Sequence, residues 1–438
     1  MFASLTRAAS PRTTPAAATP DVLCDDAGCA GFTASRRRVL GGLALGGLTT
    51  VTGSAVVTMS GAPALAAEGY DDSVLVVLSL RGASDGLSLV VPHGDPAYYA
   101  ARPRIAVPSD RLVAKDAFFG LHPSFTPLLP MWEAGELAAV HATGLPVANR
   151  SHFAAMEELE DAAPGSPERS GWLNRLLGES GEERAVEGVA IGSGTPPTSL
   201  YGDQPILSYA NLASGALAGE NPNDARRARR TVLERMWAAD TSRMGRAVSD
   251  AMGASDDLRI GMAQADNAAR YPASDLGRAL STVAQTVRGD FGTRLVTVDS
   301  GSWDMHNNIG TLSSGRLLPM ADDLARSMAA FFADLGAMRE RVTVVTISEF
   351  GRRVAENSSM GLDHGWGNAM LVAGAGVSGG RYYGRWPGLQ NTLDADLTVT
   401  TDYRSVLSEI VATRFPGASV PAVFPGFTRE SVGVMRGL

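Results

Sequence analysis

Residues 74–86 of the sequence read VLVVLSLRGASDG. The first five side chains are all aliphatic, and an unbroken apolar run of this kind is typical of a strand buried on both faces of a parallel sheet. The run ends in a polar turn that contains Arg81 and Asp85. Because open α/β sheets bind ligands beyond the carboxyl ends of their strands, this turn predicts one wall of a functional site.

Similar apolar runs recur along the chain, and amphipathic segments of helix length separate several of them. The further runs lie at residues 137–141, 186–191, 294–298, 342–347 and 369–373, and the helical segments at 151–162, 317–338 and 403–415. Alternating strands and helices predict an α/β protein with a doubly wound sheet and helices on both faces.

Residues 211–290 have a different composition, rich in Ala, Arg, Asp and Met with helical spacing. They predict a mostly helical insertion or cap. The α/β core is then expected in two parts, residues 67–210 and residues 291–438.

The N-terminal 66 residues have the features of a targeting segment. Residues 35–40 read SRRRVL, a weakly apolar run follows, and residues 64–66 read ALA. These features predict a twin-arginine signal peptide that is cleaved during export to the periplasm or the outside. A retained membrane anchor is the alternative, but Gly and Thr dilute the apolar run, so no stable membrane span is expected after processing. Cys24 and Cys29 both precede the run, so the mature chain has no disulfide or thiolate ligand.

The overall composition excludes several classes of function. The 438 residues are 45% hydrophobic and 19% charged, which is enough apolar material for a large core. A net charge of -8 excludes a generally basic surface that binds nucleic acid. Lys115 is the only lysine and no Gly-rich loop precedes it, so Schiff-base and P-loop chemistry are excluded. The sequence contains no indication of the oligomeric state.

Asp304 and His306 are spaced so that an extended segment would place both side chains on one face, where they could bind one cation. Mixed oxygen and imidazole ligands favour Zn, Mn or Fe over Mg or Ca. Alternatively, Asp304 caps a turn and His306 packs against Trp303. His122 and His141 are predicted as structural histidines.

Further candidates follow other strands. Glu349 ends the strand at 342–347 and is a metal ligand or the ion-pair partner of Arg352 or a neighbouring arginine. Asp363 and His364 are metal ligands or turn residues.

Ser151 begins the predicted helix at 151–162, immediately before His152. It is either a helix N-cap or a nucleophile, because a helix N-terminus also stabilises an anion and lowers the pKa of a hydroxyl. Arg81 could bind an oxyanion or pair with Asp85.

Several of these segments are ordered motifs that resemble one family. They include LRGASDGL (80–87), GDPAYY (94–99), RSHF (150–153), WDMH (303–306), SEFGR (348–352), DHGWGN (363–368) and TDYR (401–404). The chain resembles the exported bacterial family called domain of unknown function 1501, within the alkaline phosphatase and sulfatase superfamily. This resemblance implies an alkaline phosphatase-like fold and a site for two metal ions.

Carried over in chain order, the resemblance implies that Asp85 is the first acid and Ser151 the nucleophile. Asp304, His306 and His364 would form the second metal cluster.

Phe350 lies where these enzymes usually have a histidine ligand, and it cannot bind metal. Asp363 or His152 then replaces the missing ligand, or the site holds one metal, or the first site has decayed.

The function implied is that of an exported hydrolase of phosphate or sulfate esters with one or two divalent metal ions, Zn or Mn in preference to Mg or Ca. Its substrate would be a small, glycan-linked or lipid-linked anionic ester. The alternative is a catalytically decayed exported protein of the same fold that binds a ligand or assembles with a partner.

Overall fold

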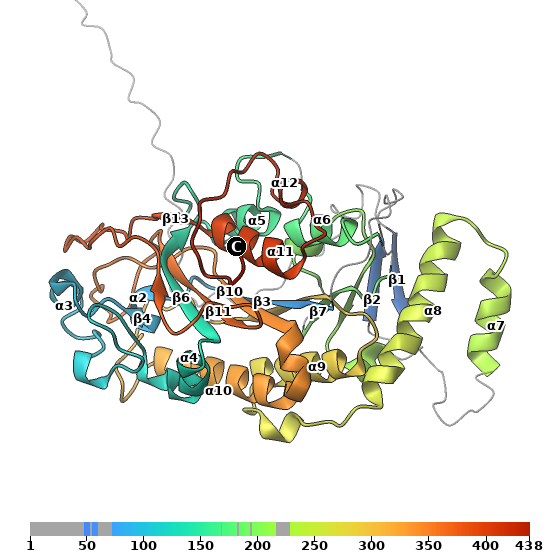
Figure 1. Ribbon diagram of the computed structural model, residues 1–438, viewed down its shortest axis with the longest axis horizontal. Coiled ribbons are helices and arrows are strands. Elements are labelled where there is room, and N and C mark those ends of the chain that lie inside the picture. Colours follow the sequence, from blue (N-terminus) through green and yellow to red (C-terminus); the bar gives the residue numbers. More distant parts are fainter. Residues whose placement is uncertain are drawn as a thin grey trace, which may run out of the picture.

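The computed structural model describes residues 48–52, 55–59, 72–167, 169–181, 184–192, 195–215 and 228–438. The SRRRVL motif and the predicted cleavage site lie outside the described residues. Figure 1 shows a central sheet between two layers of helices.

The sheet has eleven strands in the order β1-β2-β8-β7-β9-β3-β10-β11-β6-β12, with β13 also paired to β6. Their bounds are β1 (Leu48–Thr52), β2 (Ala55–Met59), β3 (Val74–Leu80), β6 (Leu137–Gly144), β7 (Gly188–Ile191), β8 (Ile206–Tyr209), β9 (Leu295–Ser300), β10 (Val342–Ile347), β11 (Asn368–Gly374), β12 (Tyr382–Tyr383) and β13 (Thr401–Asp402). A separate small sheet pairs β4 (Val90–Val91) with β5 (Gly120–Leu121).

The centre of the large sheet is parallel. The five neighbouring strands β8, β7, β9, β3 and β10 all run in one direction, and β11 is antiparallel to both β10 and β6. All six predicted strands are present, and the prediction of a doubly wound α/β sheet is confirmed. The antiparallel pair of β1 and β2, which extends the sheet beyond β8, falls within the segment predicted as a signal peptide.

The α-helices are α2 (Gly86–Leu89), α3 (Pro96–Ala101), α4 (Leu129–Glu133), α5 (His152–Asp161), α6 (Trp172–Gly178), α7 (Ala228–Trp237), α8 (Arg243–Met262), α9 (Asp275–Gly289), α10 (Leu317–Leu335), α11 (Tyr403–Arg414) and α12 (Val420–Val423). None of the helices in the described ranges is long and apolar enough to cross a membrane.

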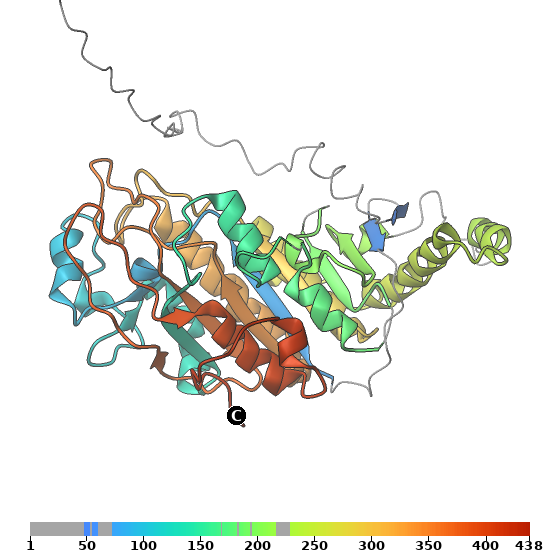
Figure 2. The same ribbon diagram turned by 90° about the horizontal axis from the view of Figure 1, so that it is seen from above.

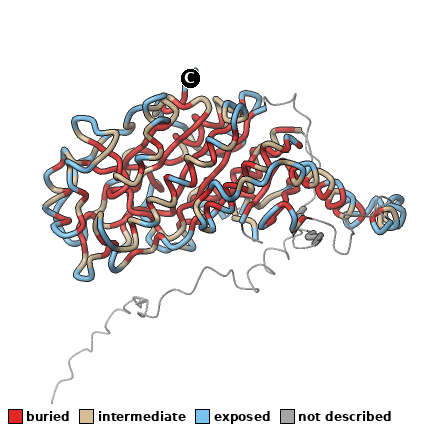
Figure 3. The backbone as a smooth tube through the Cα atoms, turned by 90° about the horizontal axis from the view of Figure 1, so that it is seen from below, coloured by how far each residue is buried: buried red, intermediate tan, exposed pale blue. Residues whose placement is uncertain are grey.

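Successive side chains of β3 point to opposite faces of the sheet, as expected for a strand. Val76 and Leu78 pack in the cluster that contains the inner faces of α9 and α10, whereas Leu75 and Val77 pack with α5, α6 and α11. Helices therefore cover both faces, as predicted (Figure 2). Figure 3 shows the resulting buried interior.

The described part of the predicted insertion consists mainly of α7, α8 and α9. Helix α9 packs against α10 on one face of the sheet, and α8 contacts β1 and β2 at the sheet's edge. In Figure 1, α7 and α8 lie at the opposite end of the molecule from α3. These two helices therefore do not cover the polar loops described below.

His122 and His141 are buried within the core. Burial lowers the pKa of each to about 4. The Nδ1 atom of His122 accepts a hydrogen bond from the backbone of Ser124, and the ring of His141 stacks on Phe119 with 4.3 Å between centroids. Both environments favour the neutral imidazole, in agreement with a structural role.

Candidate metal centre

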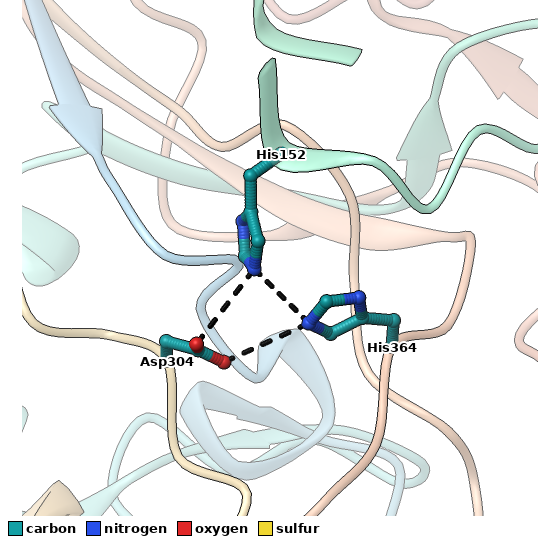
Figure 4. A group of neighbouring side chains, drawn as sticks. All are labelled: His152, Asp304 and His364. Atoms are coloured by element: carbon teal, nitrogen blue, oxygen red, sulfur yellow. Dashed lines mark hydrogen bonds and ion pairs between the residues drawn. The ribbon is translucent and has the colours of Figure 1, made fainter. Parts of the chain in front are cut away.

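Four polar side chains converge beyond the carboxyl ends of β9, β3 and β10. His152 is the first residue of α5, Asp304 and His306 follow β9, and His364 precedes β11. The Nε2 atom of His364 lies 3.0 Å from Nε2 of His152 and 3.0 Å from Nε2 of His306. Asp304 Oδ1 lies 3.1 Å from His306 Nε2 and 3.7 Å from His364 Nε2. Figure 4 shows three of these side chains pointing toward one another.

The outer nitrogen of each imidazole is held by an oxygen that accepts a hydrogen bond. His152 Nδ1 lies 2.8 Å from Glu349 Oε1, and His364 Nδ1 lies 2.9 Å from the carbonyl oxygen of Arg150. A carbonyl oxygen and an ionised carboxylate can only accept, so we assign the ring proton to Nδ1 in both histidines. The Nε2 lone pairs then point into the centre.

His306 follows the same pattern, with Nδ1 3.1 Å from Asp363 Oδ1. In the tautomers that carry the ring proton on Nδ1, three imidazole lone pairs and the Asp304 carboxylate point at one another across hydrogen-bond distances. Such an arrangement repels itself unless a proton or a metal ion lies in the middle, and histidines oriented through Nδ1 in this way are characteristic of metal sites. The donor set therefore fits a divalent metal ion.

Arg352 holds the carboxylate of Asp304. Its side chain is buried, with Nη2 2.6 Å from Asp304 Oδ1, while Nε and Nη1 donate to the carbonyls of Ala83 and Leu362. Burial raises the pKa of Asp304, but the hydrogen bonds from His306 and His364 and the charge of Arg352 lower it further, to well below its usual range. Asp304 is therefore ionised at any physiological pH.

The three histidines differ in electrostatic setting. The hydrogen bond to Asp304 raises the pKa of His306, whereas burial lowers the pKa of His364. Neutral imidazole is the form that binds a metal. His364 Nε2, which lies 3.0 Å from Nε2 of both other histidines, is therefore the central nitrogen of the group and is favoured in its neutral form.

The turn after β3 is built around Gly82. Its φ of +106° and the 2.5 Å that would separate a Cβ atom from the backbone nitrogen of Asp304 both require glycine. The Gly82 N–H donates to Glu349 Oε1 over 2.8 Å, the same atom that holds His152. Hydrogen bonding lowers the pKa of Glu349 against the effect of its burial, so this carboxylate stays ionised behind the centre.

Four of the non-glycine residues with positive φ in the described ranges lie in the loops around the centre. They are Ala83 (57°), Ser302 (72°), Asn308 (45°) and Met360 (53°), all in loops that carry or adjoin the four side chains. This conformation costs free energy for residues with a Cβ atom and persists where the surrounding structure enforces it, often at functional sites.

Phe350, which departs from the expected histidine, forms a wall of the centre. It is buried, and its ring centroid lies 4.9 Å from that of His152 and 4.9 Å from that of His364. Contact with an aromatic ring restricts both imidazoles to one orientation.

Asp85 lies outside the centre. Its two oxygens lie 2.5 Å and 3.0 Å from the guanidinium nitrogens of Arg102, and both side chains are buried. The resemblance assigned this carboxylate to a first metal ion, but in the structure both of its oxygens are bound by Arg102. Arg81 is held between Glu160, at 2.6 Å, and Asp299, at 3.0 Å.

Ser151 occupies the N-cap position of α5, but its side chain makes no capping hydrogen bond. Asn149 instead fixes the turn before the helix, because its Oδ1 accepts from the Ser151 N–H while its Nδ2 donates to Glu158. The exposed hydroxyl of Ser151 is therefore not needed to start the helix.

The sequence did not indicate the roles of Arg102 and Arg352. Glu349 was expected to bind metal or pair with Arg352 or its neighbour, whereas it holds His152 and Arg352 holds Asp304. Nothing in the local pattern separates Arg352 from Arg353, since both follow the same strand.

The sequence matches the family described as "Protein of unknown function (DUF1501)" over residues 72–404. Curated proteins include no match to it. Among solved structures, the phosphonate monoester hydrolase of Agrobacterium radiobacter is similar, with 10% identity and a TM-score of 0.32 over 82% of this chain and 78% of that one. The C-terminal periplasmic domain of EcEptC from Escherichia coli, in complex with Zn, has 10% identity and a TM-score of 0.36 over 84% of this chain and 92% of that one.

Proposed function

The chain belongs to the family described as "Protein of unknown function (DUF1501)", and from that premise we propose that it is an exported, metal-dependent hydrolase of phosphate or sulfate esters. The observation that carries the proposal is the convergence of three imidazole Nε2 atoms and one carboxylate in a partly exposed site. Such a site can bind a metal ion and still admit a ligand.

The proposed ligands are His152, Asp304, His306 and His364. The donor atoms of His152, Asp304 and His364 lie within 4.8 Å of one another, and His306 adjoins two of these side chains. Imidazole with one carboxylate favours Zn or Mn over Mg or Ca. One metal ion is proposed in place of two, because Arg102 occupies the carboxylate of Asp85.

A bound metal ion would polarise the ester oxygen and lower the pKa of the attacking hydroxyl. The anionic group needs such a cation, because Arg81 and Arg352 are already engaged by carboxylates. The N-terminus of α5, beside Ser151, contributes a further favourable field for the negative charge.

Ser151 is proposed as the nucleophile. Its oxygen forms the bond to phosphorus or sulfur as the bond to the leaving alcohol breaks, and its proton passes to solvent. Water then attacks the covalent intermediate, which releases the inorganic acid and restores the hydroxyl. The proposed substrates are small, glycan-linked or lipid-linked anionic esters.

Metal content tests the proposal most directly. We expect the purified protein to contain about one transition-metal ion per chain and EDTA to lower its Tm by several degrees. A metal ion at a free concentration one hundred times its Kd stabilises the folded state by about 2.7 kcal/mol. A metal-free protein whose melting curve is unmoved by Zn or Mn would show that no such site forms. Bound metal with no hydrolysis of any phosphate or sulfate ester would favour the decayed binding protein.

Export is proposed from residues that lie outside the described ranges. Replacing both Arg36 and Arg37 with lysine should leave the precursor in the cytoplasm, because the paired arginines define the signal. Arg38→Lys, in the same run, is the matched control and should be exported. Cell fractionation with an antibody to the C-terminus measures the outcome, and normal export of the double variant would argue against this route.

A further inference from the structure

A recess of about 420 Å³ is lined in part by Trp366, from the loop that carries His364. This volume is within the range of small-molecule binding sites. Polar side chains and one aromatic ring form much of its lining, namely Trp366, Gln390, Thr392, Asp394, Asp396 and Thr398.

The recess and the metal centre share one framework. Trp366 follows His364 by two residues, and Asp396 forms an ion pair with Arg150, whose carbonyl oxygen holds the ring of His364. Arg353, next to the arginine that holds Asp304, lies 3.0 Å from Asp396. A group bound in the recess would therefore be placed in fixed relation to the metal centre.

The charges around the recess offset each other. Asp394 and Asp396 contribute two carboxylates, while Arg150 and Arg353 place two guanidinium groups against Asp396 from behind the lining. The lining residues themselves include two carboxylates and no basic side chain, so the recess suits neither a phosphate nor a sulfate group.

The lining instead offers hydrogen-bond donors and acceptors around an apolar face. The amide of Gln390 and the hydroxyls of Thr392 and Thr398 both donate and accept, and the carboxylate of Asp394 accepts. Adjacent hydroxyl groups on a sugar ring make complementary bonds, and the C–H face of the ring can pack on Trp366.

We propose that this recess is a subsite for a neutral, polyhydroxylated group, a sugar ring, that carries the ester cleaved at the metal centre. The cleavage of an attached ester rests on the proposed hydrolase function, whereas the binding of the sugar ring does not. Recognition of the ring would then restrict the substrates to sugar phosphates or sugar sulfates.

Binding of neutral sugars tests the subsite without any catalysis. The probes are methyl glycosides of hexoses, N-acetylhexosamines and pentoses at millimolar concentration, with saturation-transfer NMR on the EDTA-treated chain. We expect transfer to the ring protons of at least one glycoside and its loss in the Gln390→Ala, Asp394→Asn double variant. Asn391→Ala is the matched control, since this exposed amide lies in the same loop but does not line the recess.

Kinetics of the metal-loaded protein form the second arm. We expect the double variant to lower the ratio of kcat/KM for a hexose phosphate to that for phenyl phosphate by about tenfold, as for the loss of one or two hydrogen bonds. No transfer to any glycoside, or equal transfer in the double variant, would overturn the subsite even if esters are hydrolysed. Transfer that depends on Gln390 and Asp394 in a protein without hydrolysis would support the subsite and reject the proposed enzyme.

Discussion

Replacing Ser151 with alanine is expected to lower kcat for ester hydrolysis by about 10⁴-fold or more, as removal of a nucleophile does in other hydrolases. The same change should alter the free energy of unfolding by less than about 0.5 kcal/mol, because the Ser151 side chain makes no capping hydrogen bond and is exposed. Metal content should stay at the wild-type level. Steady-state kinetics, urea unfolding and metal analysis of one preparation measure all three quantities.

Ser242→Ala provides the matched control at another helix start. Ser242 is also exposed at an N-cap position, but its Oγ accepts the backbone N–H of Gly245. Its removal should cost about 1 kcal/mol of stability and leave hydrolysis unchanged. If Ser151→Ala behaved like Ser242→Ala, with activity retained, Ser151 would not be the nucleophile and water would have to attack the ester directly.

Replacing His364 with alanine should remove both the metal ion and the activity. His364 Nε2 is the atom nearest to the Nε2 atoms of both other histidines, so its loss leaves the remaining donors without a common centre. We expect the metal content to fall from about one ion per chain to near zero. The EDTA-induced decrease in Tm should disappear with it, because no binding free energy is left to lose.

His93→Ala is the control for loss of an imidazole elsewhere. His93 contacts the carbonyl oxygen of Asp116 and has no part in the centre. It should keep metal, activity and the response to EDTA. Wild-type metal content in His364→Ala would contradict the proposed ligand set.

Glu349→Gln separates a ligand from a residue that orients one. Glu349 Oε1 holds both His152 Nδ1 and the Gly82 N–H, so the amide should weaken metal affinity by about 10- to 100-fold without abolishing it. Titration of the EDTA-treated variant with Zn measures this intermediate effect. A complete loss of binding, equal to that of His364→Ala, would indicate that Glu349 itself binds the metal.

Phe350 stands where the resembling enzymes have a histidine ligand, and the structure shows what this phenylalanine does instead. The sequence shows a missing ligand, whereas the structure shows a ring packed against His152 and His364. Together with the Asp85–Arg102 pair, it favours a single metal ion.

The sequence by itself determined the layered fold, because apolar periodicity is a local property. An unbroken apolar run such as residues 74–78 is buried on both sides only when it lies between two layers, and all six predicted runs form strands. Among the parallel strands it missed β8 (Ile206–Tyr209), where Ser208 interrupts a short apolar run. The cluster of Asp304, His306 and His364 was implied by the family resemblance. The fold brings these side chains together because β9 ends and the antiparallel β11 begins at the same edge of the sheet.

Only the tertiary structure decided the partner of each charged group. Arg352 donates to Asp304, 48 residues away in the sequence, and Glu349 contacts His152, 197 residues away. Asp85 forms an ion pair with Arg102. A buried charge must find an opposite charge or a hydrogen bond, but the sequence does not say which of several candidates lies within reach. That choice depends on how the turns pack, as where Gly82 brings the end of β3 against Asp304 and Glu349.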